Sequence, residues 1–179
     1  MAQSDELEQI IRGCKAGRAE SFEALVDIYA KRCYGYFYRL TGSRAVSDDL
    51  LSELYLKLAT KIRSYKGGVF ESWLFRTASN IFYDYLRDKQ QQKRLLEARQ
   101  SQEQAHAAAA APKRADAEMA DKLQMQMSRL DADTRELIML RFYSQLSFKE
   151  LAKMRAEPIG TTLSKVHRGL KKLRELMEQ

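Results

Sequence analysis

The sequence lacks much of what several classes of protein need. Its 179 residues include only two cysteines, two prolines and eight glycines, and no apolar run is long enough to span a bilayer. Two cysteines are too few for a disulfide framework, so we expect Cys14 and Cys33 to be free thiols in a reducing compartment. The opening residues, MAQSDELEQI, lack the pattern of a secretory signal. We therefore expect a cytoplasmic protein with no membrane insertion.

Groups that carry catalysis or bind metal ions are also scarce. The two histidines, His106 and His167, have no cysteine or acid at metal-ligand spacing. The sequence contains neither a phosphate-cradling loop of the P-loop type nor a nucleophile–base arrangement. We therefore expect no enzyme activity, no metal and no cofactor, so that any chemistry belongs to a partner.

Positive charge, in contrast, is abundant. The chain has 31 lysines and arginines against 24 aspartates and glutamates, which gives a formal net charge of +7 at pH 7. Such an excess favours a polyanionic partner, with nucleic acid first and an acidic membrane surface second.

Apolar residues recur at helical spacing almost everywhere, and no stretch alternates with period two, which predicts an all-α fold. The pattern breaks after Leu96, where a run of five alanines and Pro112 occur among few large apolar residues. Alanine favours helix, but without an apolar stripe nothing holds such a helix onto a core. We predict two small helical domains, residues 1–90 and 123–179, joined by a flexible linker over residues 91–122.

Two short helices separated by a turn are expected in the second domain. Ser147 and Glu150 form a capping-box pattern that opens the first, and Pro158 suits the first turn of the second. The second helix begins with small and polar residues and continues with basic ones, as in a helix that enters a major groove. Its candidate DNA-contacting residues are Gly160, Leu163, Ser164, Lys165, His167, Arg168 and Lys171. The same pattern also fits an ordinary helical hairpin with a solvated basic face.

This stretch, LSFKELAKM…PIGTTLSKVHRGLKKLRE, resembles the C-terminal helix-turn-helix of bacterial RNA polymerase sigma factors, especially the extracytoplasmic-function (ECF) group. The matching residues are Leu146, Ser147, Phe148, Glu150, Ala152, Pro158, Gly160, Thr161, Ser164 and Arg168. The sequence departs from the family where Arg155, Ala156 and Glu157 replace the usual Leu-Gly-Ile turn, and where Thr162 replaces a core valine. The resemblance implies recognition of the promoter −35 box and adds Thr161 to the contacting residues.

An acidic helix in the first domain is a candidate docking site. In SDDLLSELYLKLATKI, leucines form a stripe that faces a core, while Asp49, Glu53 and Leu56 lie on the other side. Acids around an exposed leucine suit a basic partner, although they also fit a solvated face with one stray leucine. The stretch resembles the sigma-factor helix that docks on the clamp helices of the polymerase β′ subunit. The resemblance implies polymerase contacts for Asp48, Asp49, Leu50, Glu53 and Leu56.

A glycine-containing loop and the helix after it form a candidate site for single-stranded DNA. One face of the helix gathers Arg76, Asn80, Tyr83 and Arg87. Arginines can hold phosphates, an amide can pair with a base edge and a tyrosine ring can stack on a base. This face also fits a solvated helix surface, and Trp73 falls on the packing side, as a core residue would.

The segment FESWLFRTASNIFYDYLRDK resembles the sigma-factor helix that, with the loop before it, opens the −10 promoter box and captures a flipped base. The resemblance implies −10 contacts for Tyr65, Lys66, Val69, Phe70, Trp73, Arg76, Asn80, Tyr83 and Arg87. Specificity is expected in the loop pocket formed by Tyr65, Lys66 and Val69.

Together the two blocks imply an ECF-type sigma factor that binds core RNA polymerase through its β′ clamp helices and β flap and directs promoter-specific initiation. Regulation by an anti-sigma factor is expected from the same resemblance. Two alternatives stay open. In the first, the chain is a freestanding helix-turn-helix DNA-binding regulator that never touches polymerase. In the second, it is a sigma-like decoy that binds an anti-sigma factor without initiating transcription.

Overall fold

A computed structural model of the chain describes residues 2–100 and 115–178, and every regular element within those ranges is helical. The all-α prediction is therefore confirmed. The elements are α1 (Ala2–Lys15), α2 (Ala19–Thr41), α3 (Arg44–Lys61), the 3-10 turn η1 (Ile62–Ser64), α4 (Phe70–Gln100), α5 (Ala115–Ser128), α6 (Ala132–Tyr143), α7 (Phe148–Arg155) and α8 (Ile159–Met177). Both ends of the predicted linker are helical, as parts of α4 and α5, and the stretch between them lies outside the described residues.

Short local interactions fix several helix ends. Gly42 ends α2 in the left-handed region at φ 71°, and Ser43 then caps α3 with its side chain. The predicted capping box is confirmed: the Ser147 hydroxyl accepts from the Glu150 N–H, and the Glu150 carboxylate accepts from the Ser147 N–H at 2.7 Å.

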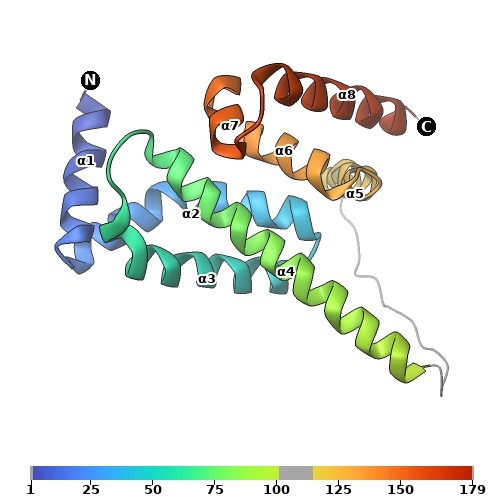
Figure 1. The fold of residues 1–179 in the computed structure, drawn as a ribbon, viewed down its shortest axis with the longest axis horizontal. Coiled ribbons are helices and arrows are strands. Elements are labelled where there is room, and N and C mark those ends of the chain that lie inside the picture. The colour runs from blue at the N-terminus through green and yellow to red at the C-terminus, as the bar shows by residue number, and fades with distance from the viewer. Residues whose placement is uncertain (1, 101–114, 179) are drawn as a thin grey trace.

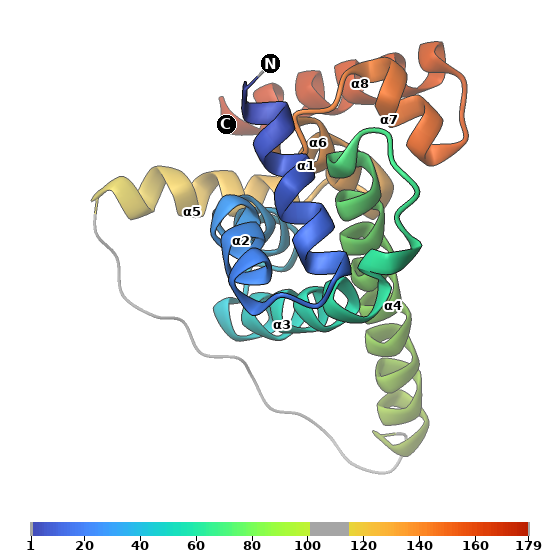
Figure 2. The same cartoon turned by 90° about the vertical axis from the view of Figure 1, so that its left-hand side faces the viewer.

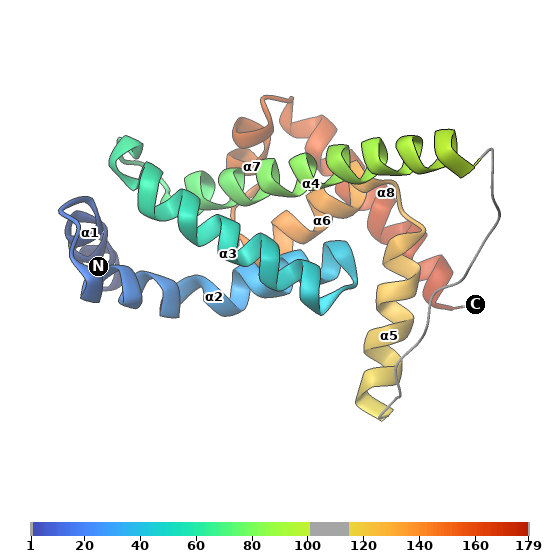
Figure 3. The ribbon, with the colours of Figure 1, turned by 90° about the horizontal axis from the view of Figure 1, so that it is seen from below.

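The first domain is a bundle in which α2 packs against α1, α3 and α4 (Figure 1). Its centre is aromatic, because Tyr36 and Phe37 of α2 and Phe75 and Phe82 of α4 are all fully buried. The rings of Tyr36 and Phe75 meet edge to face, with centroids 5.6 Å apart. The C-terminal part of α4 runs beyond this bundle, away from the other helices (Figures 1 and 3).

The second domain contains α5 to α8, with α7 and α8 as the helix-turn-helix (Figure 1). Thr162, Val166 and Gly169 are the buried residues on the inner side of α8. This helix approaches α6 so closely that a Cβ atom at Gly169 would lie 2.4 Å from Thr134 Cγ2. The other side of α8 is exposed.

The two domains pack against each other within one continuous core. Helices α5 and α6 lie against α2, and α7 lies against α4 (Figures 1 and 2). Buried apolar residues of both domains, such as Phe75 and Ile138, belong to one cluster. Arg32 of α2 also donates to the backbone carbonyls of Tyr143 at 2.8 Å and Ser144 at 2.7 Å. The sequence predicts two domains on a tether and does not predict this contact.

Glu136 places a carboxylate inside the domain interface, where its side chain is 0% exposed. Tyr36 of the first domain donates its hydroxyl to Glu136 Oε1 at 2.9 Å, and Arg155 forms an ion pair with Oε2. Burial raises the pKa of Glu136, and the neighbouring Arg155 charge with hydrogen bonds from Ser79 and Tyr36 opposes that rise. A buried carboxylate is stable only when it is paired and hydrogen-bonded, so Glu136 requires partners from both domains.

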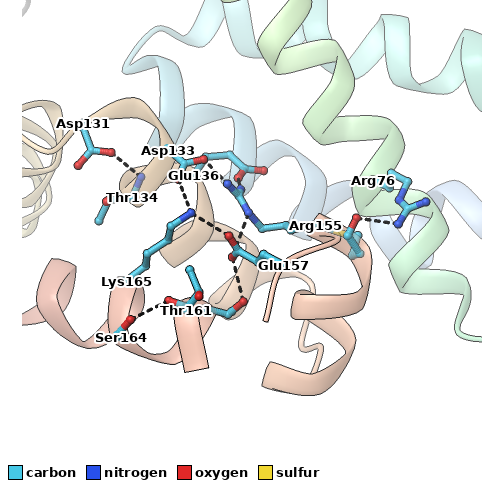
Figure 4. A network of polar contacts seen from close by, with 12 residues as sticks. Arg76, Asp131, Asp133, Thr134, Glu136, Arg155, Glu157, Thr161, Ser164 and Lys165 are labelled. Atoms are coloured by element: carbon cyan, nitrogen blue, oxygen red, sulfur yellow. Dashed lines mark hydrogen bonds and ion pairs between the residues drawn. The ribbon is translucent and has the colours of Figure 1, made fainter. Parts of the chain in front are cut away.

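The residues that depart from the sigma-factor turn pattern form a polar network (Figure 4). Arg155 pairs with two carboxylates of α6. Glu157 accepts hydrogen bonds from Thr162 Oγ1 at 2.9 Å and from Lys165 Nζ at 2.8 Å. The buried Thr162 hydroxyl is thereby satisfied. Polar pairing therefore replaces the apolar contacts that leucine, isoleucine and valine would make at these positions.

This network favours the charged forms of Arg155, Glu157 and Lys165. Burial opposes the charge of Arg155, but the attraction of Glu136 and Asp133 leaves its pKa raised. Burial also opposes the charge of Glu157, yet the hydrogen bond from Lys165 and further polar contacts bring its pKa below the ordinary 4.5. The same hydrogen bond raises the pKa of Lys165. The turn is thus held by ion pairs at neutral pH.

Arg155→Leu would restore the family's usual residue but leave the buried Glu136 carboxylate without its cation. We expect the free energy of unfolding to fall by about 3–5 kcal/mol, measured by urea denaturation at pH 7. Arg174→Leu, at an exposed position of α8, is the control and should change it by less than about 0.5 kcal/mol. Arg155→Leu/Glu136→Leu should recover most of the loss, and an undiminished loss in this double variant would contradict the pairing.

Ala156→Gly tests the backbone of the same turn. Ala156 ends α7 in the left-handed region at φ 54° and ψ 41°, where the family pattern has glycine. A residue with a Cβ atom is disfavoured there, so glycine should stabilise the protein by about 0.5–1 kcal/mol after its greater unfolded-state entropy is counted. The measurement is the urea midpoint. Ala59→Gly, within α3, should instead lower that midpoint. A fall in both variants would show that the left-handed backbone of Ala156 is not unfavourable for alanine.

Candidate polymerase and nucleic-acid interfaces

The acidic surface of α3 is built as the sequence predicts, with one exception. Asp48 and Asp49 are exposed, and Leu56 is 69% exposed although it is a large apolar residue. Glu53 is half-buried, with Oε1 2.7 Å from Lys57 Nζ. Leu50, the exception, is buried in the core, where it can orient the helix but cannot touch a partner. The remaining acids surround one exposed leucine.

Residues 65–69 form a tight loop before α4. Gly67 and Gly68 have φ values of 103° and 95°, which residues with a Cβ atom rarely adopt. The Tyr65 hydroxyl closes the loop by donating to the Gly68 carbonyl at 2.6 Å. Lys66 and Val69 remain exposed at its surface.

Three aromatic residues that the resemblance assigns to DNA pack together where this loop joins α4. Tyr65 and Phe70 are buried, Trp73 is half-buried, and their ring centroids are 5.3 to 5.7 Å apart. Tyr65 and Phe70 support the loop, and both also line the cleft beside it. Trp73 lies on the packing side, as the helical spacing indicates.

A cleft of about 610 Å³ separates the loop from α1. Arg12 and Lys15 of α1 line it together with Lys66 and Val69 of the loop. Lys15 Nζ also donates to the Tyr65 carbonyl at 2.5 Å, which ties α1 to the loop. The sequence analysis did not identify the α1 residues, because no local pattern shows that α1 packs beside a loop fifty residues away.

A second, polar groove of about 290 Å³ lies between α3 and α4. Its lining residues are Lys57, Lys61, Thr77, Asn80, Tyr83, Asp84 and Arg87. Asp84 forms ion pairs with Arg87 and, at 3.8 Å, with Lys57, whereas Lys61 has no carboxylate within 4 Å among the described residues. The sequence analysis missed Lys57 and Lys61. Their spacing of four residues, which places both on one face of α3, is the signal that could have found them.

The structure brings together the four polar residues predicted on α4, but two of them contact the second domain. Asn80 and Arg87 are exposed. Arg76 Nη2 donates to the Met154 carbonyl at 2.6 Å, and the Tyr83 hydroxyl donates to Asp133 Oδ1 at 3.3 Å. Burial and the nearby carboxylates raise the pKa of Tyr83 to about 12. We refer to Arg76, Asn80, Tyr83 and Arg87 as the α4 polar face.

The predicted DNA-contacting residues of α8 lie mostly on its outer side. Those that are exposed are Gly160, Leu163, Ser164, His167, Arg168 and Lys171, whereas Thr161 is half-buried. Lys165 differs, because its ammonium group is paired with Asp133 at 3.1 Å and with Glu157. It therefore supports the turn rather than extending freely from the helix.

The described ranges hold neither a membrane-spanning helix nor a cluster of metal-ligating residues. No helix there is long and apolar enough to cross a membrane. Within residues 2–100 and 115–178, no group of three or more histidines, cysteines, aspartates or glutamates is placed to hold a metal ion.

Family models match both domains. The model of Sigma-70 region 2 matches residues 25–92, and that of Sigma-70 region 4 matches residues 127–175. The first match contains the acidic surface of α3 and the α4 polar face, and the second contains the helix-turn-helix.

Whole-chain comparisons agree with the domain matches. The ECF RNA polymerase sigma factor SigW of Bacillus subtilis is 27% identical over 178 residues, which cover 94% of this chain and 95% of that protein. The sigma factor RpoE of Bartonella quintana, solved in complex with the anti-sigma factor NepR, has the same fold, with a TM-score of 0.74, 22% identity and coverage of 89% of this chain and 98% of that one.

The RNA polymerase sigma factor CarQ of Myxococcus xanthus is 32% identical over 163 residues, which cover 90% of this chain and 91% of that protein. Sigma factors are DNA-binding initiation factors rather than enzymes; they bind core RNA polymerase and direct promoter-specific transcription. With both domain matches in order along the chain, this protein belongs to the extracytoplasmic-function group of RNA polymerase sigma factors.

Proposed function

We propose that this sigma factor divides initiation between two domains. Residues 1–90 bind core polymerase and open the −10 box, residues 123–179 recognise the −35 box, and residues 91–122 connect them. The observation that carries this proposal is a chain of ion pairs, in which Lys57 contacts Glu53 at 2.7 Å and Asp84 at 3.8 Å. It joins the acidic surface of α3 to the polar groove beside α4, so that docking on polymerase positions the DNA-opening residues.

The docking step uses the outer side of α3. Asp48, Asp49 and Glu53 supply negative charge around the exposed Leu56, which suits a partner that is basic and partly apolar. The polymerase partner proposed for this surface is the β′ clamp helices, and the β flap is the proposed partner of the second domain.

The melting step uses the α4 polar face and the loop. Lys61 and Arg87 hold phosphates of the displaced strand, and Asn80 and Tyr83 contact its bases. The cleft between the loop and α1 receives an extruded base, since its volume of about 610 Å³ is within the range of small-ligand sites. Capture there offsets the cost of unstacking the base.

The outer side of α8 reads the −35 box. Its first two turns present Gly160, Ser164 and neighbouring small or polar groups to base edges, while Arg168 and Lys171 neutralise phosphates. The chain itself performs no covalent chemistry in this scheme and acts in the cytoplasm, where polymerase is found. An anti-sigma factor is the proposed regulator, supported by the similarity of fold to RpoE, which was solved with NepR.

Glu53→Lys tests docking through the acidic surface of α3. Reversing this charge should weaken binding to purified core polymerase at least tenfold, because like charges across an interface cost several kcal/mol. The measurement is comigration on a sizing column at one stated salt concentration. Glu23→Lys, at an exposed position of α2, applies the same charge change outside both proposed polymerase-binding surfaces and should comigrate as the wild type does.

The outcomes separate the alternatives. If the wild-type chain elutes apart from polymerase, the docking proposal is wrong, and the freestanding regulator and the decoy are the functions that remain. A chain that binds polymerase but yields no transcript in a run-off assay on genomic promoter fragments would leave only the decoy.

Lys61→Ala tests the groove between α3 and α4. Removing one phosphate contact should lower the slope of log affinity against log salt by about 0.7 for single-stranded DNA. The measurement is fluorescence anisotropy with a pool of random-sequence 20-nucleotide strands. Lys31→Ala, at an exposed position of α2, is the matched control. Equal slopes in the two variants would show that Lys61 does not contact the DNA phosphates.

A further inference from the structure

We propose that α1 selects the base that enters the cleft beside the loop. Glu8 and Arg12 supply the selecting groups, and the bases that they fit are guanine and cytosine. This inference rests on the function proposed above for the cleft, and it adds the selecting residues and the class of base. The DNA contacts predicted from the sequence lie in the loop, α4 and α8, and none of them lies in α1.

The interior of the cleft is apolar. Ile11 of α1 is 5% exposed and Phe70 of α4 is 2% exposed, and both line the cleft together with the buried Tyr65. Leu7 lines it from α1 and Val69 from the loop. A base can bury its flat faces against such side chains, as flipped bases do. Because every base has such faces, the interior does not distinguish one base from another.

Most of the polar groups that line the cleft are already bound. Lys15 Nζ donates to the Tyr65 carbonyl at 2.5 Å, and Glu71 accepts a hydrogen bond from a hydroxyl of α2 at 2.7 Å. Glu8 and Arg12 instead form an ion pair at 3.5 Å, with side chains that are 69% and 71% exposed. Such an exposed pair contributes little to stability, so a ligand can use its groups without destabilising α1.

A carboxylate beside a guanidinium group can distinguish bases by their pairing edges. The carboxylate offers two acceptors side by side, and the guanidinium group offers two donors side by side. Guanine has two adjacent donors, N1–H and the N2 amino group, next to the O6 acceptor. Cytosine has two adjacent acceptors, N3 and O2, next to the N4 amino group. Each can form a bidentate contact with one member of the pair and a third hydrogen bond with the other.

Adenine and thymine fit the same pair less well. The pairing edge of adenine has one donor and one acceptor, and that of thymine has one donor between two acceptors. Neither base offers two like groups side by side, so neither can form the bidentate contact. Loss of one bidentate contact weakens binding roughly tenfold. The Glu8–Arg12 pair therefore favours guanine or cytosine over the other two bases.

Selection by α1 also requires that this helix be held at a fixed place beside the loop. The hydrogen bond from Lys15 to Tyr65 is one such tie, and Arg63 Nε donates to the Lys15 carbonyl at 3.2 Å as a second. Helix α1 also packs against η1, which leads into the loop (Figures 1 and 2). Lys15 lies less than one turn beyond Arg12. The selecting groups thus stand on a rigid element, as precise recognition needs.

The experiment uses the full chain and 20-nucleotide strands of thymidine that carry guanine, cytosine, adenine or thymine at one central position. Affinity is measured by fluorescence anisotropy at fixed salt. We expect the strand with guanine or the strand with cytosine to bind roughly tenfold more tightly than the all-thymidine strand. In Glu8→Gln/Arg12→Lys, which keeps the size of both side chains similar, this ratio should fall to about one.

Single variants show which of the two bases is captured. Guanine would place its two donors on the carboxylate, so Glu8→Gln should remove a preference for guanine. Hypoxanthine, which lacks the N2 amino group, should then bind the wild type no better than thymine does. Cytosine would place its two acceptors on the guanidinium group. In that case Arg12→Lys should remove the preference while leaving affinity for the all-thymidine strand unchanged, because the charge is kept.

Two matched variants serve as controls. Glu6→Gln lies on the opposite side of α1 from Glu8, and Arg44→Lys lies at the exposed first position of α3, so both should keep the wild-type ratio. Equal affinities for the four strands, a preference for adenine, or a preference that survives in Glu8→Gln/Arg12→Lys would overturn selection by α1 and leave single-strand binding intact. A chain that binds none of the strands would contradict the melting step proposed above as well.

Discussion

The pairing of the buried Glu136 carboxylate is the constraint on which the rest of this structure depends. Burial of an ionisable group is costly, and Glu136 meets that cost with Arg155 from its own domain and Tyr36 from the other. Arg155 in turn replaces an apolar residue of the family's turn. The charged residue in the turn and the closed packing of the domains therefore both depend on the same buried carboxylate.

The consequences extend to the helix-turn-helix. Glu157 lies 3.6 Å from Arg155 Nε, pairs with Lys165 and satisfies Thr162. Lys165 consequently points inward, although its place on a basic helix is typical of a phosphate contact. The exposed basic residues of α8 are Arg168, Lys171, Lys172 and Arg174. A substitution in the turn that frees Lys165 would therefore add to the positive charge of the surface proposed to read the −35 box.

Much of the fold could be predicted because its signals are local. The capping box at Ser147, the apolar stripes and the outward placement of Leu56 all follow from residues within a few turns of each other. The buried positions of Tyr65 and Phe70, and the part that α1 plays beside the loop, depend on packing between distant segments. The sequence also marks Arg155, Ala156 and Glu157 as departures from a family. Only their three-dimensional arrangement shows that the departures compensate for one another.

The projecting end of α4 sets a limit on how far the protein can reach. This helix spans 31 residues from Phe70 to Gln100, about 46 Å at 1.5 Å per residue, and its last turns leave the bundle (Figure 3). Residues 101–114 add at most about 50 Å when fully extended. In the function proposed above, the −10 and −35 surfaces are joined by α4 and the residues that follow it, so the distance between the two surfaces has an upper limit. Promoters whose two boxes are farther apart than that limit would be excluded by length alone, whatever their sequence.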